Sequence, residues 1–224
     1  MILHIETATT NCSVSLTQNG LVVSFKEYAN VQYSHAEQLH LFIEEVLTQA
    51  DKSLNDLSAI AVSKGPGSYT GLRIGVSAAK GLCYALDIPL ISVPTLLSLA
   101  LPFKPDEGQL AVPMLDARRM EVYMCAYNHK MEQIIPTTAT VIEAHTLLDL
   151  AKSYDKLHLI GSGADKVLEI TPANNLVAHG AVLPSAKDMA LISYELWNKQ
   201  TFEDVAYFEP FYLKDFMAPL PKRK

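Results

Sequence analysis

The sequence predicts an α/β protein built from two related βββαβα units. The chain opens with segments typical of three antiparallel strands, and helical and strand periodicity alternate after them. Residues 110–126 repeat the opening pattern of strand, turn and strand. Each copy has an acidic residue, Glu6 or Asp116, where its first strand reaches the turn. A duplicated unit produces this repetition, and 224 residues suffice for two small domains.

The opening strands follow from side-chain period and turn chemistry. Residues 1–7 are a short apolar segment, and residues 12–17 alternate apolar with polar side chains, the period of a half-buried strand. Asn19 and Gly20 form a strong hairpin signal because both positions of the tight turn need positive φ. Residues 21–27 are therefore expected to return as a third antiparallel strand.

Helices and short strands are predicted next. Residues 34–50 form a helix that starts with a capping box of Ser34 and Glu37, in which each side chain bonds the other's backbone N–H. Residues 59–63 and 89–93 are short apolar runs typical of buried strands. Further helices are expected over residues 70–86, from residue 94 and over residues 185–198, and a further strand over residues 157–161.

The polar segment DEGQ, residues 106–109, is the best domain boundary. It separates an N-terminal domain, residues 1–105, from a smaller and degenerate second domain, residues 106–224. The C-terminal segment of the second domain is expected to pack back on the first.

Composition excludes several classes of protein. The net charge of −6 gives no general attraction for nucleic acid. One basic cluster, PKRK at residues 221–224, is either a frayed terminus or a phosphate-contacting tail. The three cysteines are scattered, which indicates a reducing compartment. With neither a signal peptide nor a run of about 18 apolar residues, the sequence predicts a cytoplasmic protein with no membrane partner.

The Gly-rich stretch GPGSYTGLRIG admits three interpretations: a phosphate cradle, a tight turn or a surface for another protein. It lacks the Lys of a P-loop, and Gly65, Gly67 and Gly71 have the wrong spacing for a dinucleotide fingerprint. Pro66 also removes a backbone donor. The helix that follows is apolar around most of its circumference. This suits burial within the chain and packing against a partner equally well.

Candidate catalytic groups are sparse. His35 and His40 are five residues apart, about 140° around a helix, so they do not clamp one metal ion. Glu6 and Asp116 would face each other across a cleft between two related units, as carboxylates that organise a metal ion do. Neither has the Gly-rich neighbours of a phosphate loop.

Two turns in the second half stay open to alternatives. The polar turn Asp116–Arg119 is either a solvated hairpin tip or a site that faces the inter-domain cleft. The stretch GSGADK, residues 161–166, is either a plain strand-to-helix turn or a turn near a nucleotide.

Four segments together resemble the TsaB (YeaZ) family, bacterial accessory proteins for making threonylcarbamoyladenosine in tRNA. They are IETATTNCSVSL, SHAEQL, AIAVSKGPGSYTGLRIGVSAAKGL and LDARRMEVYMCAY. The resemblance covers most of the first half and the hairpin of the second. It implies an actin-like, sugar-kinase and Hsp70-type (ribonuclease H-like) fold. It also implies a paralogous catalytic partner, TsaD, which transfers the threonylcarbamoyl group.

The resemblance also implies that the chain lacks catalytic equipment. Where TsaD-like proteins carry a VNHxEAH-like metal motif, this chain has Thr95, Leu97 and Leu99. No catalytic and no metal-binding residue is therefore assigned. The two helices of the first unit are expected to pair with the same two helices of TsaD as a four-helix bundle. The partner-binding residues assigned on this basis are Leu39, Phe42, Ile43, Val46, Gly71, Leu72, Gly75, Val76 and Ala79.

The implied function is that of a non-catalytic subunit. It binds and activates TsaD for threonylcarbamoyl transfer to the adenosine next to the anticodon. Implied partners are TsaD in a heterodimer, the TsaE ATPase in a larger complex, a second copy when TsaD is absent, and tRNA only indirectly. No tightly bound cofactor is expected. ATP or ADP is admitted at the partner interface, and Glu6, Thr7 and Asp116 are the weak nucleotide-binding candidates.

The alternative function is that of an autonomous enzyme of the same fold, an ATPase or a metallopeptidase-like protein. A small-molecule kinase of this fold is a further alternative. The missing metal motif argues against the peptidase, and the missing Gly-rich phosphate loops argue against the kinase.

Overall fold

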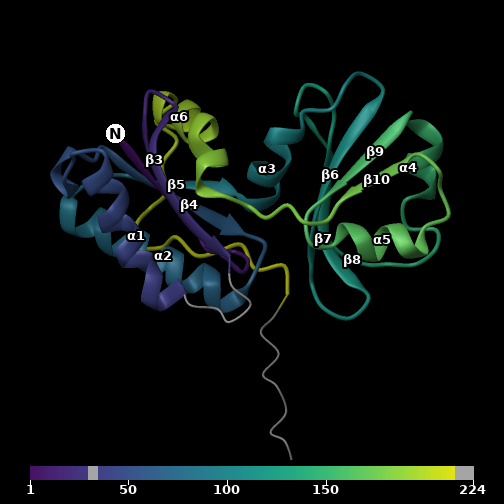
Figure 1. Cartoon of the computed structure of the whole chain (residues 1–224), viewed down its shortest axis with the longest axis horizontal. Coiled ribbons are helices and arrows are strands. Elements are labelled where there is room, and N and C mark those ends of the chain that lie inside the picture. Colours follow the sequence, from purple (N-terminus) through teal and green to yellow (C-terminus); the bar gives the residue numbers. More distant parts are fainter. Residues whose placement is uncertain (30–34, 215–224) are drawn as a thin grey trace, which may run out of the picture.

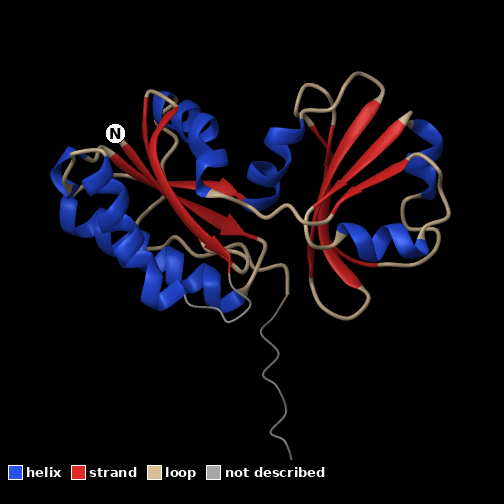
Figure 2. Cartoon of the chain, in the orientation of Figure 1, coloured by secondary structure: helices blue, strands red, loops and turns tan. Residues whose placement is uncertain are grey.

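The computed structural model describes residues 1–29 and 35–214, which form two units, each built around a five-stranded sheet (Figures 1 and 2). The strand order is β3-β2-β1-β4-β5 in the first sheet and β8-β7-β6-β9-β10 in the second. In both sheets the central strand, β1 or β6, pairs antiparallel with the next strand in the chain and parallel with the fourth strand of its unit. The predicted α/β duplication is therefore confirmed.

The elements of the two units follow one another along the chain. The first unit contains β1 (Ile2–Glu6), β2 (Asn11–Gln18), β3 (Leu21–Ala29), α1 (His35–Gln49), β4 (Ala59–Gly65), α2 (Tyr69–Leu86) and β5 (Leu90–Pro94), and α3 (Thr95–Ala100) leads out of it. The second contains β6 (Gln109–Asp116), β7 (Glu121–Tyr127), β8 (Gln133–Val141), α4 (Leu148–Ser153), β9 (Lys156–Ile160), α5 (Ala164–Ile170) and β10 (Leu176–His179). The final helix is α6 (Ala190–Asn198), and short 3₁₀ helices cover Leu54–Asp56, Leu101–Phe103 and Ala186–Met189.

Turn and cap residues account for several of these boundaries. Asn19 and Gly20 have φ of 52° and 78°, so the predicted hairpin between β2 and β3 is confirmed. Ser68 is the N-cap of α2, and its hydroxyl accepts a hydrogen bond from the Gly71 backbone N–H at 3.3 Å. The capping box predicted for α1 involves Ser34, which lies outside the described residues.

The first sheet is covered by helices on both faces. Leu3, Ile5 and Val62 point toward α1 and α2, which together form the larger core of this unit. On the opposite face, Ile2 and Ile91 pack against Met189 and the apolar side of α6. The strands β1 and β4 are therefore buried on both faces, as expected for the parallel part of a sheet.

The C-terminal strap, residues 199–214, runs back along the first unit. Its backbone bonds to the sheet twice: Glu203 donates to the carbonyl of Leu90 at 2.9 Å, and Phe211 donates to that of Lys64 at 2.7 Å. The side chain of Phe208 is buried in the core beneath α2. The strap therefore belongs structurally to the first unit, although it follows the second in sequence.

The second sheet is also covered on both faces. One face carries α4 and α5, and the other carries α3, whose Leu96 and Leu99 pack against Leu115 and Ile160. Because α3 follows β5 directly, it joins the two units (Figure 1). Within the described ranges, no helix combines the length and the apolar character needed to cross a bilayer.

Candidate functional site: the outer face of the first helix pair

The nine residues predicted to contact a partner lie in the core of the first unit. Seven of them carry a side chain, and each of these seven exposes at most 6% of its surface. They are Leu39, Phe42, Ile43, Val46, Leu72, Val76 and Ala79. The other two, Gly71 and Gly75, are buried as well. Both helices turn their apolar stripe toward the sheet, as amphipathic helices on a sheet do. The assignment of these side chains to a partner surface is therefore wrong, and the other face of the same helices is the one that meets solvent.

Gly71 and Gly75 bring α2 close to the turn that follows β1. A Cβ atom on Gly71 would lie 2.1 Å from the carbonyl oxygen of Thr7, and one on Gly75 would lie 2.3 Å from its Oγ1. The Thr7 hydroxyl donates a hydrogen bond of 2.8 Å to the carbonyl of Gly71. Gly71 and Gly75 of the Gly-rich stretch thus make a close contact within the chain.

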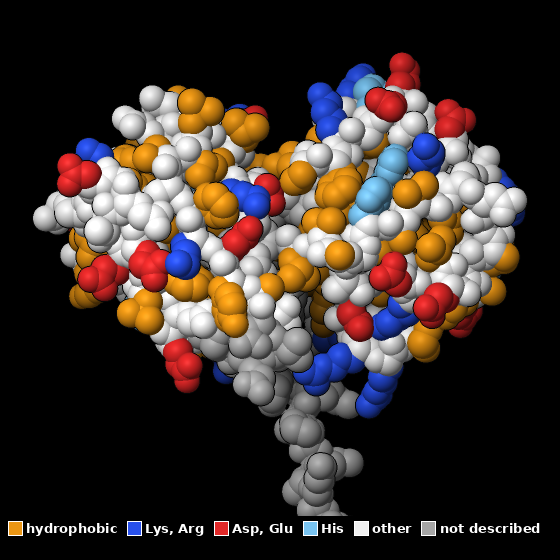
Figure 3. All heavy atoms as spheres, viewed as in Figure 1, with side chains coloured by type: hydrophobic (Ala, Val, Ile, Leu, Met, Phe, Trp, Pro, Cys, Tyr) orange, Lys and Arg blue, Asp and Glu red, His pale blue; other side chains and the backbone are white. Residues whose placement is uncertain are grey.

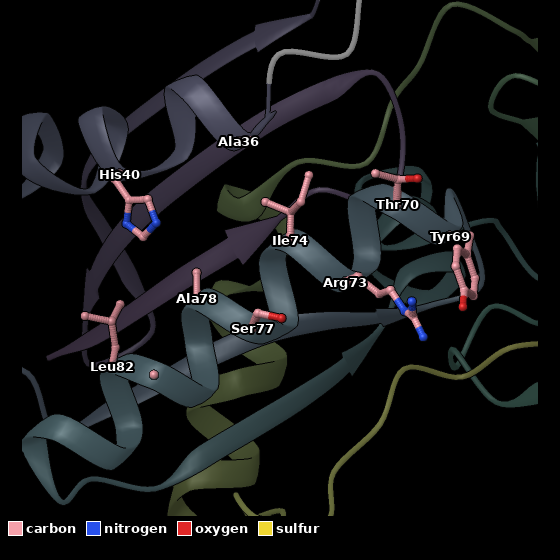
Figure 4. Close-up of a pocket in the computed structure, with 10 residues that line it drawn as sticks. Ala36, His40, Tyr69, Thr70, Arg73, Ile74, Ser77, Ala78 and Leu82 are labelled. Carbon is pink, nitrogen blue, oxygen red and sulfur yellow. The ribbon is translucent and has the colours of Figure 1, made fainter.

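The solvent-facing sides of α1 and α2 form an open apolar groove of about 720 Å³, the outer groove. Figure 4 shows His40 of α1 pointing toward α2, with Ile74, Ala78 and Leu82 on the side of α2 that faces α1. The groove is lined by Ala36, His40, Tyr69, Thr70, Arg73, Ile74, Ser77, Ala78, Gly81 and Leu82. Its floor is small and apolar because Ala78 and Gly81 carry little or no side chain.

One end of the outer groove is aromatic and cationic. The guanidinium of Arg73 lies 4.4 Å from the centre of the Tyr69 ring, within the range of a cation–π contact. Tyr212 of the C-terminal strap adds a second ring, 5.0 Å from that of Tyr69. A hydrogen bond with Tyr212 holds the pKa of Arg73 above its usual value. The strap therefore forms part of the rim of this groove.

The nucleotide candidate Glu6 is fully buried at the end of β1. One carboxylate oxygen, Oε1, accepts hydrogen bonds from the backbone of Ala8 at 2.6 Å and the hydroxyl of Ser63 at 2.8 Å, while the buried Oε2 accepts none from the residues that the structure describes. Burial raises the pKa of Glu6 to about 7, and these hydrogen bonds oppose the shift. Thr7 is buried too, so the structure leaves neither side chain open to a nucleotide, and this prediction is corrected.

Asp116, the third nucleotide candidate, lies exposed at the end of β6. Its Oδ1 pairs with the ammonium of Lys166 at 2.5 Å and accepts the backbone N–H of Arg118 at 2.7 Å. No hydrogen bond or ion pair joins Asp116 to Glu6 within residues 1–29 and 35–214. Two carboxylates that share a metal ion need no direct bond, so the predicted facing of Glu6 and Asp116 across a cleft stays a prediction.

The positions that carry the metal motif in TsaD-like proteins are structural here. Thr95 and Leu99 are buried, and the Thr95 hydroxyl accepts the backbone N–H of Gly65 at 3.1 Å. In the described part of the chain, no three His, Cys, Asp or Glu side chains group closely enough to hold a metal ion. His35 is buried against the carbonyl of Thr9, whereas His40 is exposed in the outer groove.

Comparison with known proteins finds related sequences over most of the chain. The family model "TsaD: tRNA N6-adenosine threonylcarbamoyltransferase" matches residues 29–159. The "tRNA threonylcarbamoyladenosine biosynthesis protein TsaB" of Escherichia coli (strain K12) is 29% identical over 97% of this chain and 96% of its own length. The TsaB protein of Buchnera aphidicola subsp. Schizaphis graminum (strain Sg) is 31% identical over 75% of this chain and 80% of its own.

A solved structure of a related protein has a similar fold. "YeaZ from Pseudomonas aeruginosa" superposes with a TM-score of 0.81 at 26% identity and covers 95% of this chain and 99% of its own. With two sheets of the same strand order, the fold is the two-domain α/β fold of actin-like type.

Proposed function

The chain belongs to the TsaB family of tRNA threonylcarbamoyladenosine biosynthesis proteins, and from this we propose that it is a non-catalytic subunit that binds and activates a TsaD-type transferase. Its role is in tRNA threonylcarbamoyladenosine biosynthesis. The transfer of the threonylcarbamoyl group to the adenosine next to the anticodon takes place on the partner.

The outer groove is the observation that carries this proposal. The family model spans residues 29–159 and so includes both α1 and α2, which means that a TsaD-type transferase has a corresponding helix pair. Two like helix pairs can pack face to face because each offers an apolar groove to the other's ridges. We therefore place the partner on the solvent-facing side of α1 and α2.

The composition of the groove suits close packing of helices. Ala78 and Gly81 allow a partner helix to approach, and the half-buried Ile74 and Leu82 have apolar surface left to cover. Arg73 and Tyr69 lie at one end of the groove, and Tyr and Arg are among the residue types enriched in interface hot spots. Self-pairing of this surface would give the homodimer expected when the transferase is absent.

The described site residues support a subunit that leaves the chemistry to its partner. Glu6, the one carboxylate at the end of the first central strand, is sealed in the core. Thr95, Leu97 and Leu99 offer one hydroxyl and two hydrocarbon side chains where TsaD-like proteins have metal ligands. A larger complex with the TsaE ATPase, ATP or ADP at the pairing surface, and a cytoplasmic location stay predictions.

A pair of matched variants tests the proposed surface. Ser77→Arg places a long charged side chain in the groove without touching the core, because Ser77 is exposed. Gln49→Arg is the control: Gln49 is exposed on α1, nine residues beyond His40 and therefore about 180° around the helix.

Binding to the transferase is measured by isothermal titration calorimetry. Ser77→Arg should weaken it at least about thirtyfold, since burying an unpaired charged side chain in an apolar interface costs on the order of 2 kcal/mol or more. The control should bind like the wild type. Equal affinity of all three proteins would remove the outer groove from the interface.

A further inference from the structure

Two histidines lie next to each other on the second sheet. His158 lies within β9 and His179 ends β10, and both side chains are half-buried. His158 shares its face of the sheet with Ile160, two residues further along the strand, which packs against α3. The two imidazole rings are stacked, with centroids 5.5 Å apart and planes inclined by 26°. Histidine side chains, in pale blue, reach the surface of the second unit in Figure 3.

The facing ring nitrogens of this pair have the separation of two ligands on one metal ion. Nδ1 of His158 lies 3.3 Å from Nε2 of His179. Two imidazole nitrogens that bind a tetrahedral Zn²⁺ ion at about 2.0–2.1 Å lie about 3.3–3.4 Å apart. Small rotations of the two rings therefore suffice for both nitrogens to bind the same ion.

Gln109, the first residue of β6, fixes the tautomer of His158. Its side-chain oxygen Oε1 lies 2.9 Å from Nε2 of His158. Because an amide oxygen only accepts hydrogen bonds, Nε2 carries the proton, and Nδ1 presents its lone pair toward His179. Histidines that bind a metal ion almost always donate their other ring N–H to an oxygen in this way. His158 is therefore oriented as a metal ligand is.

Phe103 packs against the second imidazole of the pair. Its ring centroid lies 4.8 Å from that of His179, and it ends the 3₁₀ helix that connects α3 to β6. His179 is the last residue of β10, which the strand order places at the edge of the second sheet. An ion held by both histidines would therefore tie this edge strand to β9, at the point where the chain leaves the second unit.

We propose that His158 and His179 bind a divalent transition-metal ion, Zn²⁺, and that Gln109 orients His158 for this role. Imidazole nitrogens suit Zn²⁺, whereas Mg²⁺ prefers oxygen ligands. In the residues that the structure describes, no third His, Cys, Asp or Glu side chain joins the pair, so water completes the coordination. The site binds its ion reversibly and clips β10 to β9. This inference does not depend on the proposed function.

Isothermal titration calorimetry with zinc chloride tests the site on the full chain, stripped of metal by a chelator and carrying no histidine tag. His158→Gln and His179→Gln each remove one ligand, and glutamine keeps an amide near the position of Nε2. His145→Gln is the matched control, because His145 is an exposed histidine whose ring lies 3.4 Å from the carboxylate of Glu143. Circular dichroism confirms that each variant is folded.

The wild type and His145→Gln should bind one Zn²⁺ ion per chain with the same affinity, and magnesium chloride should give no saturable heat. Each substitution in the pair should weaken Zn²⁺ binding at least about tenfold, since the loss of even an outer-shell partner costs about 10–100-fold. Gln109→Met removes the oxygen acceptor and should weaken binding about tenfold for the same reason. Gln109→Glu keeps an acceptor and should restore the affinity of the wild type.

A second measurement uses the wild type alone and so does not depend on the folding of any variant. Diethyl pyrocarbonate modifies accessible neutral imidazoles, and mass spectrometry of the peptides gives the extent of reaction at each histidine. Zn²⁺ should protect His158 and His179 and leave His145 reactive.

Three results would overturn the inference. They are a wild type with no saturable Zn²⁺ binding, equal Zn²⁺ affinity of the three histidine variants, and equal protection of His145 and the pair. Binding by Gln109→Met that is as tight as that of the wild type would refute the orienting role of Gln109.

Discussion

Two glycines on α2 predict opposite effects of the same substitution. Gly75 packs against Thr7, where an added Cβ would lie 2.3 Å from Oγ1. Gly81, six residues further along the same helix, has no atom within 4 Å of the position of an added Cβ. Replacing either glycine by Ala removes the helix penalty of Gly, which is up to about 1 kcal/mol. Any difference between the two variants therefore reports the packing at Gly75.

The size of the effect at Gly75 follows from its contacts. Overpacking a close-packed core costs about 1–3 kcal/mol, and displacing the Thr7 hydroxyl from its bond to the Gly71 carbonyl costs about 1 kcal/mol more. After the gain in helix propensity, Gly75→Ala should destabilise the protein by about 2 kcal/mol, which lowers its Tm by roughly 4–8 °C in a chain of this size. Gly81→Ala should raise the Tm by a few degrees, about 2–4 °C at most.

Thermal unfolding followed by circular dichroism separates the two variants, and a double-mutant cycle locates the cause. Thr7→Ala removes Oγ1, so Gly75→Ala should cost less in that background than in the wild type. If Gly75→Ala stabilises the protein as much as Gly81→Ala does, the close approach of α2 to the turn after β1 is refuted.

Two further substitutions test the buried carboxylate and the C-terminal strap. Burial raises the pKa of Glu6 from its ordinary value of 4.5 to about 7, so folding favours the protonated form of this side chain. The stability that protonated Glu6 contributes is therefore complete below pH 4.5 and is lost as the pH rises through 7. Glu6→Gln should remove this loss. The free energy of unfolding of the variant relative to the wild type, measured in urea, should therefore increase by about 1–3 kcal/mol from pH 5 to pH 8. A difference that does not change with pH would contradict the raised pKa. Phe208→Ala removes a side chain buried in the core of the first unit and should cost about 3 kcal/mol of stability. The neighbouring Tyr207 is 84% exposed, so Tyr207→Ala should change the stability little. Equal unfolding midpoints for the two variants would show that Phe208 does not anchor the strap in that core.

Local sequence patterns predicted the first unit well, because its elements depend on local signals. The hairpin at Asn19 and Gly20 and the periodicity of α1 and α2 need no distant contact. The short elements α4 and β10 lack such signals and were not predicted. The strap is held by long-range contacts, such as that between Phe211 and Lys64, which no local pattern reveals.

The residues predicted to contact a partner lie on the buried face of α1 and α2, whereas the outer groove proposed for the partner lies on the opposite face of the same helices. Leu39 and Val76 show that the apolar stripe follows the sheet, whereas the partner surface had been assigned to the most apolar residues. Gly75 indicates that another segment packs closely against α2, but not which segment. A glycine permits the close approach of a second chain and that of the chain's own turn equally well. The signal that marks the outer face is the polar stripe of α2, which includes Arg73 and Ser77.

The most direct measurement is the rate of threonylcarbamoyl transfer to an unmodified tRNA in a reconstituted reaction. The TsaD-type transferase is supplied with threonylcarbamoyl-adenylate and tRNA, and the modified nucleoside is quantified by mass spectrometry with no added chain, with the wild type and with Ser77→Arg. A non-catalytic activating subunit predicts efficient transfer only with the wild-type chain, none by the chain without the transferase, and a loss with Ser77→Arg that excess protein restores. A transferase that works at its full rate alone, or a chain that modifies tRNA by itself, would contradict the account.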